Sequence, residues 1–102
     1  PARLTVARWH TPAAPALDIG EREAAERFRT LLTDATRLHL RSDVPVGSCL
    51  SGGLDSSSIV CLMSAMLPQG ARARTVSACY ADKSVDERPF MEAAVVASGA
   101  PR

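Results

Sequence analysis

The residues best suited to chemistry form one short segment, Ser51–Ser57, with the sequence SGGLDSS. It follows the apolar run Val46–Leu50 and precedes apolar residues at helical spacing, so we expect it to join a strand to a helix. Ligands bind at such junctions in open α/β sheets. Gly52 and Gly53 permit backbone angles closed to other residues and let an anion approach the main chain, and the first amides of the helix attract that anion. Further donors come from the hydroxyl groups of Ser51, Ser56 and Ser57. The segment therefore predicts a phosphate-binding loop.

Asp55 places a carboxylate where the phosphates of a bound ligand would lie. Two anions at close range repel each other, so a cation is expected between them, and Mg²⁺ commonly binds through one or two carboxylates and phosphate oxygens. The segment has neither the lysine of the nucleoside-triphosphatase loop nor the glycine spacing of the dinucleotide loop. A simpler alternative is a Gly-Gly turn before a serine-capped helix. The complete seven-residue string after an apolar strand favours the phosphate site.

Alternating strands and helices are expected to position this loop. Residues 1–18 are assigned to a linker or leading segment, in which Leu4–Val6 could form a short strand before Trp9. The expected elements that follow are a helix over Glu21–Leu40, a strand over Val46–Leu50, a helix from Ser56 or Ser57 to Leu67, a strand over Arg74–Tyr80, a loop over Asp82–Ser84 and a helix from Asp86 or Glu87 to Ala97. Residues 19–102 are therefore assigned to the start of a parallel α/β sheet with right-handed crossovers and flanking helices.

Spacing also predicts the apolar face of the first helix. Its apolar residues recur three and four positions apart and form one stripe: Ala24, Ala25, Phe28, Leu31, Leu32, Ala35 and Leu38. At the last helix, Glu87 and Arg88 are expected to serve only the helix start, where glutamate is favourable and arginine is indifferent.

Composition argues against several classes of function. Twelve basic and eleven acidic residues leave the chain nearly neutral, which argues against a nucleic-acid surface driven by bulk charge. No apolar run approaches the roughly 20 residues needed to cross a bilayer, and no secretion signal is visible, so no membrane partner is expected. Cys49, Cys61 and Cys79 lie in apolar stretches without paired spacing and are expected to be buried thiols in a reducing, cytoplasmic compartment. Neither histidine has the spacing of a zinc site.

The string Ser51–Ser57, preceded by RSDVPVG at Arg41–Gly47, closely resembles the synthetase domain of glutamine-dependent asparagine synthetases. This family belongs to the ATP-pyrophosphatase group, with an adenine nucleotide α-hydrolase-like fold. The group also includes β-lactam synthetases and cyclases that form macrolactam peptides. The likeness covers nearly the whole chain and extends to Trp9, Glu21–Leu40, Thr75–Tyr80 and Asp86–Phe90.

The resemblance implies an ATP-dependent amide-forming ligase. Such an enzyme activates a carboxylate, here first of all aspartate, as an acyl-adenylate with release of pyrophosphate, and an amine or ammonia then displaces AMP. Leu50 and Ala78, at the ends of adjacent strands, would border the adenosine, and Asp55 would also bind Mg²⁺. Cys79 stands where many relatives have glycine. The pyrophosphate end of ATP would be held by Ser51, Gly52, Gly53, Asp55, Ser56 and Ser57.

The resemblance extends only to the first part of the synthetase domain. The family's substrate-binding acidic and lysine residues lie downstream of this stretch, and Pro1 stands where a glutaminase would have its amino-terminal cysteine. No catalytic residue is therefore assigned within the chain. A glutaminase domain or another source of ammonia is expected in the parent protein, and the 102 residues alone are expected to show no turnover. Two alternatives stay open: a β-lactam or macrolactam cyclase of the same fold, and a non-catalytic fragment whose open sheet edge is completed by a second chain.

Overall fold

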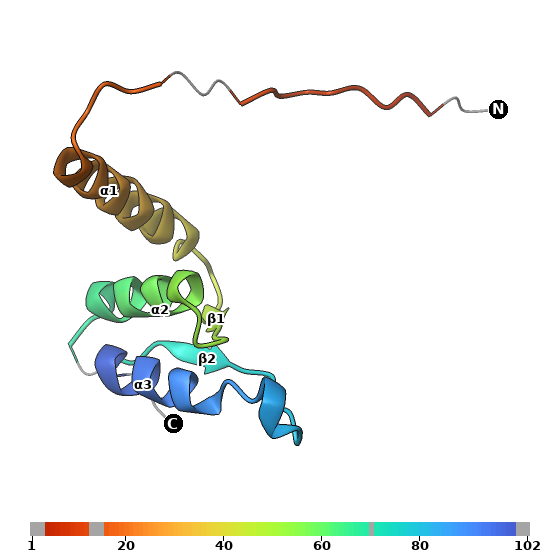
Figure 1. Ribbon diagram of the computed structural model, residues 1–102, viewed down its shortest axis with the longest axis vertical. Coiled ribbons are helices and arrows are strands. Elements are labelled where there is room, and N and C mark those ends of the chain that lie inside the picture. Colours follow the sequence, from red (N-terminus) through yellow and green to blue (C-terminus); the bar gives the residue numbers. More distant parts are fainter. Residues whose placement is uncertain (1–3, 13–15, 70, 100–102) are drawn as a thin grey trace.

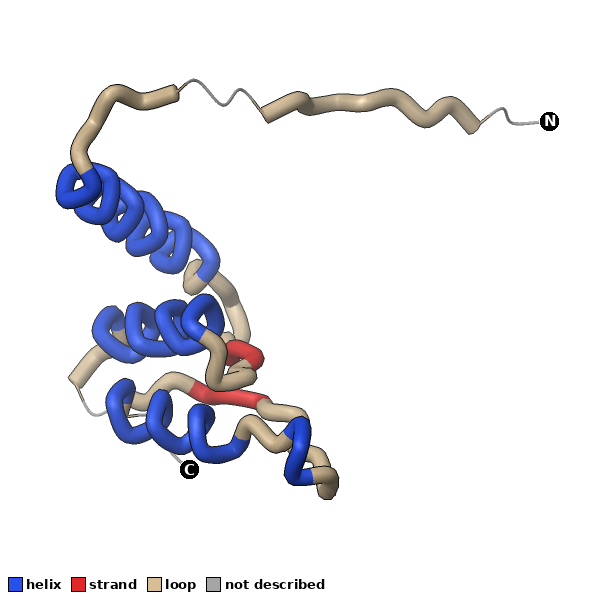
Figure 2. The backbone as a smooth tube through the Cα atoms, in the orientation of Figure 1, coloured by secondary structure: helices blue, strands red, loops and turns tan. Residues whose placement is uncertain are grey.

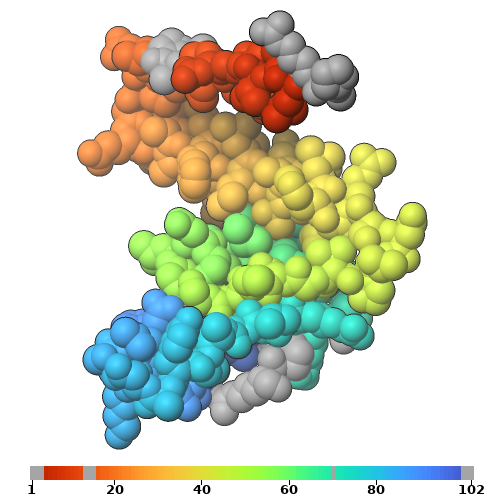
Figure 3. All heavy atoms as spheres, turned by 90° about the vertical axis from the view of Figure 1, so that its right-hand side faces the viewer, coloured from red at the N-terminus to blue at the C-terminus, as the bar shows by residue number. Residues whose placement is uncertain are grey.

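The computed structural model describes residues 4–12, 16–69 and 71–99 as three long helices stacked beside a small parallel sheet. The elements are α1 (Glu21–His39), β1 (Gly47–Cys49), α2 (Leu54–Met66), β2 (Arg74–Val76), the short 3-10 helix η1 (Lys83–Val85) and α3 (Arg88–Ser98). Helix α2 lies between α1 and α3, with the two strands beside α2 and α3 (Figure 1, Figure 2). The space-filling view shows the same succession of α1, α2 and α3 along the molecule (Figure 3). The expected α/β order of elements is confirmed.

The two strands pair in parallel, as the sequence predicts. Ser48 lies opposite Thr75 in the register, and the backbone N–H of Leu50 donates to the carbonyl oxygen of Val76 at 2.9 Å. The second strand is shorter than the expected Arg74–Tyr80 and ends at Val76. Strand geometry persists only where a neighbour accepts and donates backbone hydrogen bonds, and β1 is itself only three residues long.

The core lies where α2 and α3 meet the end of β1. Leu50 is 2 % exposed and Val60 of α2 is fully buried, and both pack with Met91 and Ala94 of α3. Met63 is also buried, as expected of a methionine that fills a core. This cluster fixes the residue directly before the Ser51–Ser57 loop.

The burial of the three cysteines differs from the prediction. Cys49 and Cys79 are exposed and Cys61 is half-buried, whereas all three were expected to be buried thiols. Successive residues of a strand point to opposite faces, so Cys49 points away from the face on which Leu50 is buried. That second face is not covered by the described residues, and Val76 on β2 is 71 % exposed there.

Helix α1 forms where its periodicity predicts it, but it buries little of its apolar stripe. Thr36 is buried and Leu32 is half-buried on the side that faces α2. Phe28 is 66 % exposed and Leu31 is 70 % exposed. Only one narrow face of α1 therefore contacts the rest of the described chain.

The starts of the other helices differ from the sequence-based boundaries. Helix α2 begins at Leu54 rather than at Ser56 or Ser57, because the amide of Ser57 already donates an α-helical bond to the carbonyl of Gly53 at 3.0 Å. The expected loop at Asp82–Ser84 partly forms η1. Helix α3 begins at Arg88, within two residues of the expected start, and a left-handed glycine ends it at Gly99. Gly70 and Pro101, residue types that end helices, would be expected to help to end α2 and α3, and both lie outside the described residues.

The leading segment does not form the short strand considered at Leu4–Val6. Residues 4–12 run away from the sheet (Figure 1), and a strand needs a neighbour for its backbone groups. Its assignment as a linker stays a prediction. Within the described ranges, no helix combines the length and the apolarity that crossing a membrane requires.

Candidate functional site

The Ser51–Ser57 segment lies where the sequence places it, between the carboxyl end of β1 and the first turn of α2. The buried side chain of Leu50 anchors its start, and the buried Val60 anchors α2 two turns later. A short loop between two buried anchors can hold its backbone amides in fixed directions, which binding an anion requires.

The amino end of α2 is open. Its N-cap residue is Gly53, which has no side chain to accept a hydrogen bond from the following amides. The first N–H groups of any helix lack partners within the helix, and here the first α-helical donor after the cap is Ser57. The amides of Leu54, Asp55 and Ser56 therefore precede the regular ladder and are suited to an anionic ligand.

Two serine side chains form hydrogen bonds across the inside of the loop. The hydroxyl oxygens of Ser51 and Ser56 lie 3.0 Å apart, and Ser56 Oγ also accepts from the Ser51 amide at 3.2 Å and donates to the Gly53 carbonyl at 3.3 Å. The Gly53 amide in turn donates to Ser51 Oγ at 3.4 Å. These hydroxyl groups thus define the shape of the loop and are not merely free donors around it. Ser57 is half-buried one position further along α2.

The two glycines have different roles, which the sequence does not reveal. Gly52 has φ +84°, in the left-handed region, and a Cβ there would lie 2.6 Å from Cβ of Phe90 and 2.8 Å from the backbone nitrogen of Met91. Gly53 has φ −68°, which any residue adopts, and a Cβ there would meet only Ser51 Oγ at 3.5 Å. The expectation of unusual backbone angles is confirmed for Gly52 and wrong for Gly53. The other role expected of Gly53, which is to let a ligand approach the main chain closely, stays a prediction.

Asp55 lies in the first turn of α2 with an exposed side chain. Among the described residues, no cluster of three or more histidine, cysteine, aspartate or glutamate side chains could hold a metal ion. A cation bound to Asp55 would therefore need phosphate oxygens and water for its other ligands, a combination that suits Mg²⁺. The donor set of this chain fits Mg²⁺ bound together with a nucleotide better than Mg²⁺ bound alone.

Leu50 and Ala78 lie at the same edge of the sheet, as expected for residues that follow adjacent parallel strands. The side chain of Leu50 is in the core, so only its backbone faces the loop side, whereas Ala78 is exposed. Their contact with an adenosine stays a prediction.

The start of α3 contains contacts that sequence reasoning missed. Arg88 was expected to be indifferent, but its Nε donates to Asp86 Oδ1 at 2.7 Å and its Nη2 donates to the carbonyl oxygen of Tyr80 at 3.3 Å. The bond from the Arg88 side chain is the main cause that holds the pKa of Asp86 below its usual 3.8, and the same bond raises the pKa of Arg88. The only feature of the sequence that could have indicated this contact is an aspartate two residues before an arginine at the expected start of a helix.

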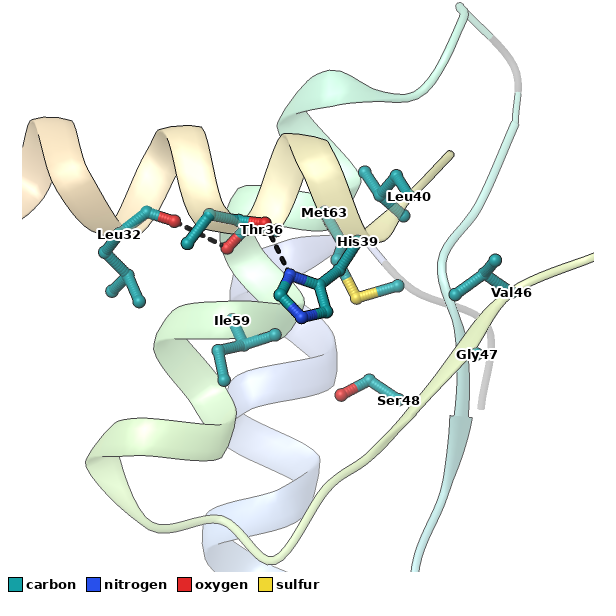
Figure 4. A pocket seen from close by; sticks show the side chains of 10 residues that line it. Leu32, Thr36, His39, Leu40, Val46, Gly47, Ser48, Ile59 and Met63 are labelled. Atoms are coloured by element: carbon teal, nitrogen blue, oxygen red, sulfur yellow. Dashed lines mark hydrogen bonds between the residues drawn. The ribbon is translucent and has the colours of Figure 1, made fainter. Parts of the chain in front are cut away.

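A separate cavity of about 310 Å³ lies between α1, α2 and β1 (Figure 4). Its walls are mostly apolar and include Leu32, Ile59 and Met63, while His39 and Ser48 add polar groups. None of the loop residues lines it. The His39 ring is fixed by a bond of 2.8 Å between Nδ1 and the carbonyl of Ala35.

Comparison with known proteins decides the family. The sequence profile described as asparagine synthase matches residues 27–101, which include the whole loop, α2, β2 and α3.

The chain belongs to the asparagine synthase family.

Individual relatives agree with this assignment. The chain is 39 % identical over 75 residues to a Methanocaldococcus jannaschii protein named "Putative asparagine synthetase (glutamine-hydrolyzing) 2", a match that covers 74 % of this chain and 14 % of that protein. It is 52 % identical over 40 residues to asparagine synthetase (glutamine-hydrolyzing) 1 of Bacillus subtilis, which covers 39 % of this chain and 6 % of that protein. It is also 44 % identical over 52 residues to the amidase chry2 of Gibberella zeae, which covers 51 % of this chain and 8 % of that protein. No solved structure matches.

The matched region is a small part of these relatives. The chain spans about 14 % of the length of the Methanocaldococcus jannaschii relative, so it corresponds to one portion of that protein. The predicted resemblance is thereby confirmed for the family, and the activity of a whole protein is a matter for proposal.

Proposed function

We propose that this chain supplies the pyrophosphate-binding loop of an ATP-dependent amide-forming ligase. The observation that carries the proposal is the open amino end of α2, capped by Gly53 and placed at the carboxyl end of a parallel strand in a member of the asparagine synthase family. Free amides, a helix dipole and nearby hydroxyl groups are the donors that a pyrophosphate group requires.

In this proposal the loop binds and orients the leaving group of the first step. The carboxylate substrate attacks the α-phosphorus of ATP, the bond to the bridging oxygen breaks, and pyrophosphate departs with its charge held by the amides of residues 54–56. Ser51 and Ser56 then exchange their mutual hydrogen bond for bonds to phosphate oxygens. Mg²⁺, held by Asp55 and phosphate oxygens, would neutralise part of the negative charge of the leaving group.

The second step lies outside the described loop. An amine or ammonia attacks the acyl carbon of the adenylate, and AMP leaves with the electrons of the broken acyl–oxygen bond. Two of the relatives are named as glutamine-hydrolyzing, which supports a glutaminase domain as the source of ammonia in the complete protein. Aspartate is the proposed carboxylate because the relatives from Methanocaldococcus jannaschii and Bacillus subtilis are named asparagine synthetases. A relative named as an amidase makes other carboxylates worth testing.

Substitution Asp55→Asn tests the metal role. In the complete protein at its natural length, we expect the affinity for ATP in the presence of Mg²⁺ to fall by about 10- to 100-fold, the usual range for groups that tune a bound metal. Calorimetry would measure binding with and without Mg²⁺, and pyrophosphate release would be followed with aspartate and ammonia. Asp43→Asn is the matched control, because Asp43 is an exposed aspartate that lies outside the loop.

Two results would count against parts of the proposal. Unchanged ATP affinity and unchanged pyrophosphate release in Asp55→Asn would exclude the metal role. Pyrophosphate release that needs another carboxylate and ignores aspartate would favour a lactam- or macrolactam-forming relative. Because the chain spans a small part of its relatives, we expect no acyl-adenylate formation from these 102 residues alone.

A further inference from the structure

Gly52 packs directly against α3, a helix that begins far from the Ser51–Ser57 segment in the sequence. A Cβ at this position would lie 2.6 Å from Cβ of Phe90 and 2.8 Å from the backbone nitrogen of Met91, and real Cβ atoms essentially never approach another atom that closely. The first turn of α3 therefore forms the back wall of the loop. Any shift of that turn moves the surface on which Gly52 rests, one residue before the N-cap of α2.

The first turn of α3 is a support and not a second phosphate site. The amide of Arg88 donates to Asp86 Oδ1 at 3.2 Å, and the amides of Phe90 and Met91 both donate to the carbonyl of Glu87, at 3.0 and 3.1 Å. Pro89, next in the turn, has no amide hydrogen to donate. The donors that could attract an anion are thus already used within the turn.

One guanidinium group fixes this turn to the segment that follows β2. Arg88 donates from Nε to Asp86 and from Nη2 to the carbonyl of Tyr80, eight residues earlier in the chain. The side chain of Asp86 is 16 % exposed and that of Arg88 is 51 % exposed, whereas the ion pair between Arg22 and Glu26 on α1 is exposed by 93 % and 68 %. Arg88 therefore closes the 80–88 loop through partly shielded contacts, unlike the solvated pairs of α1.

The Arg88 guanidinium lies between the two ends of the predicted nucleotide site, which are the adenosine end near Ala78 and the pyrophosphate loop at Gly52. Tyr80 lies two residues after Ala78, the residue expected to border adenosine, and the first turn of α3 contacts Gly52 of the pyrophosphate loop. An arginine can make both bonds at once, because its donors form a rigid planar fork. A lysine ammonium is a compact point charge without this planar fork, so we expect it to reproduce the two bonds less well.

We propose that Arg88 and Asp86 are positioning residues for the nucleotide site, which hold the first turn of α3 against Gly52 and set the distance between the loop and the segment after β2. The inference rests on the proposed function for the identity of the ligand. Neither residue is assigned a contact with substrate.

The first test measures the loop without nucleotide. In the complete protein at its natural length, hydrogen exchange of the amides of residues 50–57 is compared between the wild type, Arg88→Met and Arg88→Lys. We expect exchange in this segment to be about tenfold faster in Arg88→Met and intermediate in Arg88→Lys, with residues 21–39 of α1 unchanged. Arg27→Met is the matched control, because Arg27 forms an ion pair with Glu23 on the distant helix α1.

The second test measures function with ATP and Mg²⁺ as the probe. We expect the KM for ATP to rise by about tenfold or more in Arg88→Met, with the KM for the carboxylate unchanged. Asp86→Asn is expected to raise the KM for ATP by a smaller factor. A purely structural role would lower the melting temperature and the active fraction without changing the KM for ATP.

The outcomes separate this inference from the proposed function. Wild-type exchange at residues 50–57 in both Arg88 variants, or an unchanged KM for ATP, would overturn the positioning role. Should Arg88→Met not fold, Arg88→Lys and Asp86→Asn decide by the same two readouts. A wild-type protein that binds no ATP with Mg²⁺ would refute the proposed function, and the exchange experiment would still decide whether Arg88 holds the loop.

Discussion

At the scale of single residues, the two adjacent glycines of the loop have different structural roles. Gly52 combines a positive φ with contact against α3, whereas Gly53 has an ordinary backbone, and a Cβ there would make only a van der Waals contact with Ser51 Oγ. A sequence with two neighbouring glycines cannot distinguish these cases, because the difference arises from a helix that begins 36 residues later.

This difference predicts opposite behaviour for two alanine variants. Gly52→Ala is expected to lower stability by about 1–3 kcal/mol, from backbone strain at positive φ and overpacking against Phe90. Gly53→Ala is expected to change stability by less than about 1 kcal/mol and yet to weaken binding of ATP, since its Cβ would face the approaching phosphate. Urea unfolding and calorimetry of the complete protein would measure both quantities. Equal stability losses in the two variants would contradict the geometry described for the loop.

At the scale of elements, the sequence predicts what depends on local pattern. The helical spacing of α1, the parallel pairing that follows from a strand–helix–strand order, and the loop between β1 and α2 all agree with the structure. The start of α2 could not be predicted, because Ser56 or Ser57 was expected to begin the helix, whereas Ser56 lies within its first turn and bonds across the loop to Ser51. The role of Arg88 was also missed, since the carbonyl of Tyr80 that it contacts is a backbone group and every residue has one.

The contact between Asp86 and Arg88 predicts a pH dependence at the start of α3. The pKa of Asp86 is lower in the folded state than its usual value of 3.8, chiefly because of the hydrogen bond from Arg88. Its contribution to stability is therefore fully present above the unfolded pKa and is lost as pH falls through the lower folded pKa. We expect Asp86→Asn to melt below the wild type at neutral pH and the two melting curves to converge in acid.

Asp82 provides a reference within the same loop. Its pKa is also lowered, first by the backbone amide of Ser84 and then by the Ser84 hydroxyl. Asp82→Asn should therefore show the same convergence in acid, but without any effect on hydrogen exchange at residues 50–57. A difference between wild type and Asp86→Asn that grows as pH falls would contradict the sign derived for Asp86.

At the scale of the whole molecule, the described chain has more surface than a compact protein of its size. Its accessible area is 8857 Å² at 10.8 kDa, whereas size scaling gives about 5500 Å² for a compact monomer. Its radius of gyration is 18.0 Å, against roughly 13 Å for a compact domain of 100 residues. Part of the excess comes from residues 4–12, which are all exposed, and part is apolar surface on α1 and on the open face of the sheet.

This surface predicts how the 102-residue polypeptide behaves when it is produced by itself. Exposed apolar residues such as Phe28 and Leu31 on α1 and Val76 on β2 should bind the dye ANS and promote self-association. Size-exclusion chromatography and ANS fluorescence would measure both effects, and Phe28→Ser with Leu31→Ser should reduce them. Arg22→Ser, a change at an exposed polar residue of the same helix, is the control. A monomer that binds no dye would show that these residues repack in isolation, whereas the complete protein should keep them covered and bind far less dye per chain.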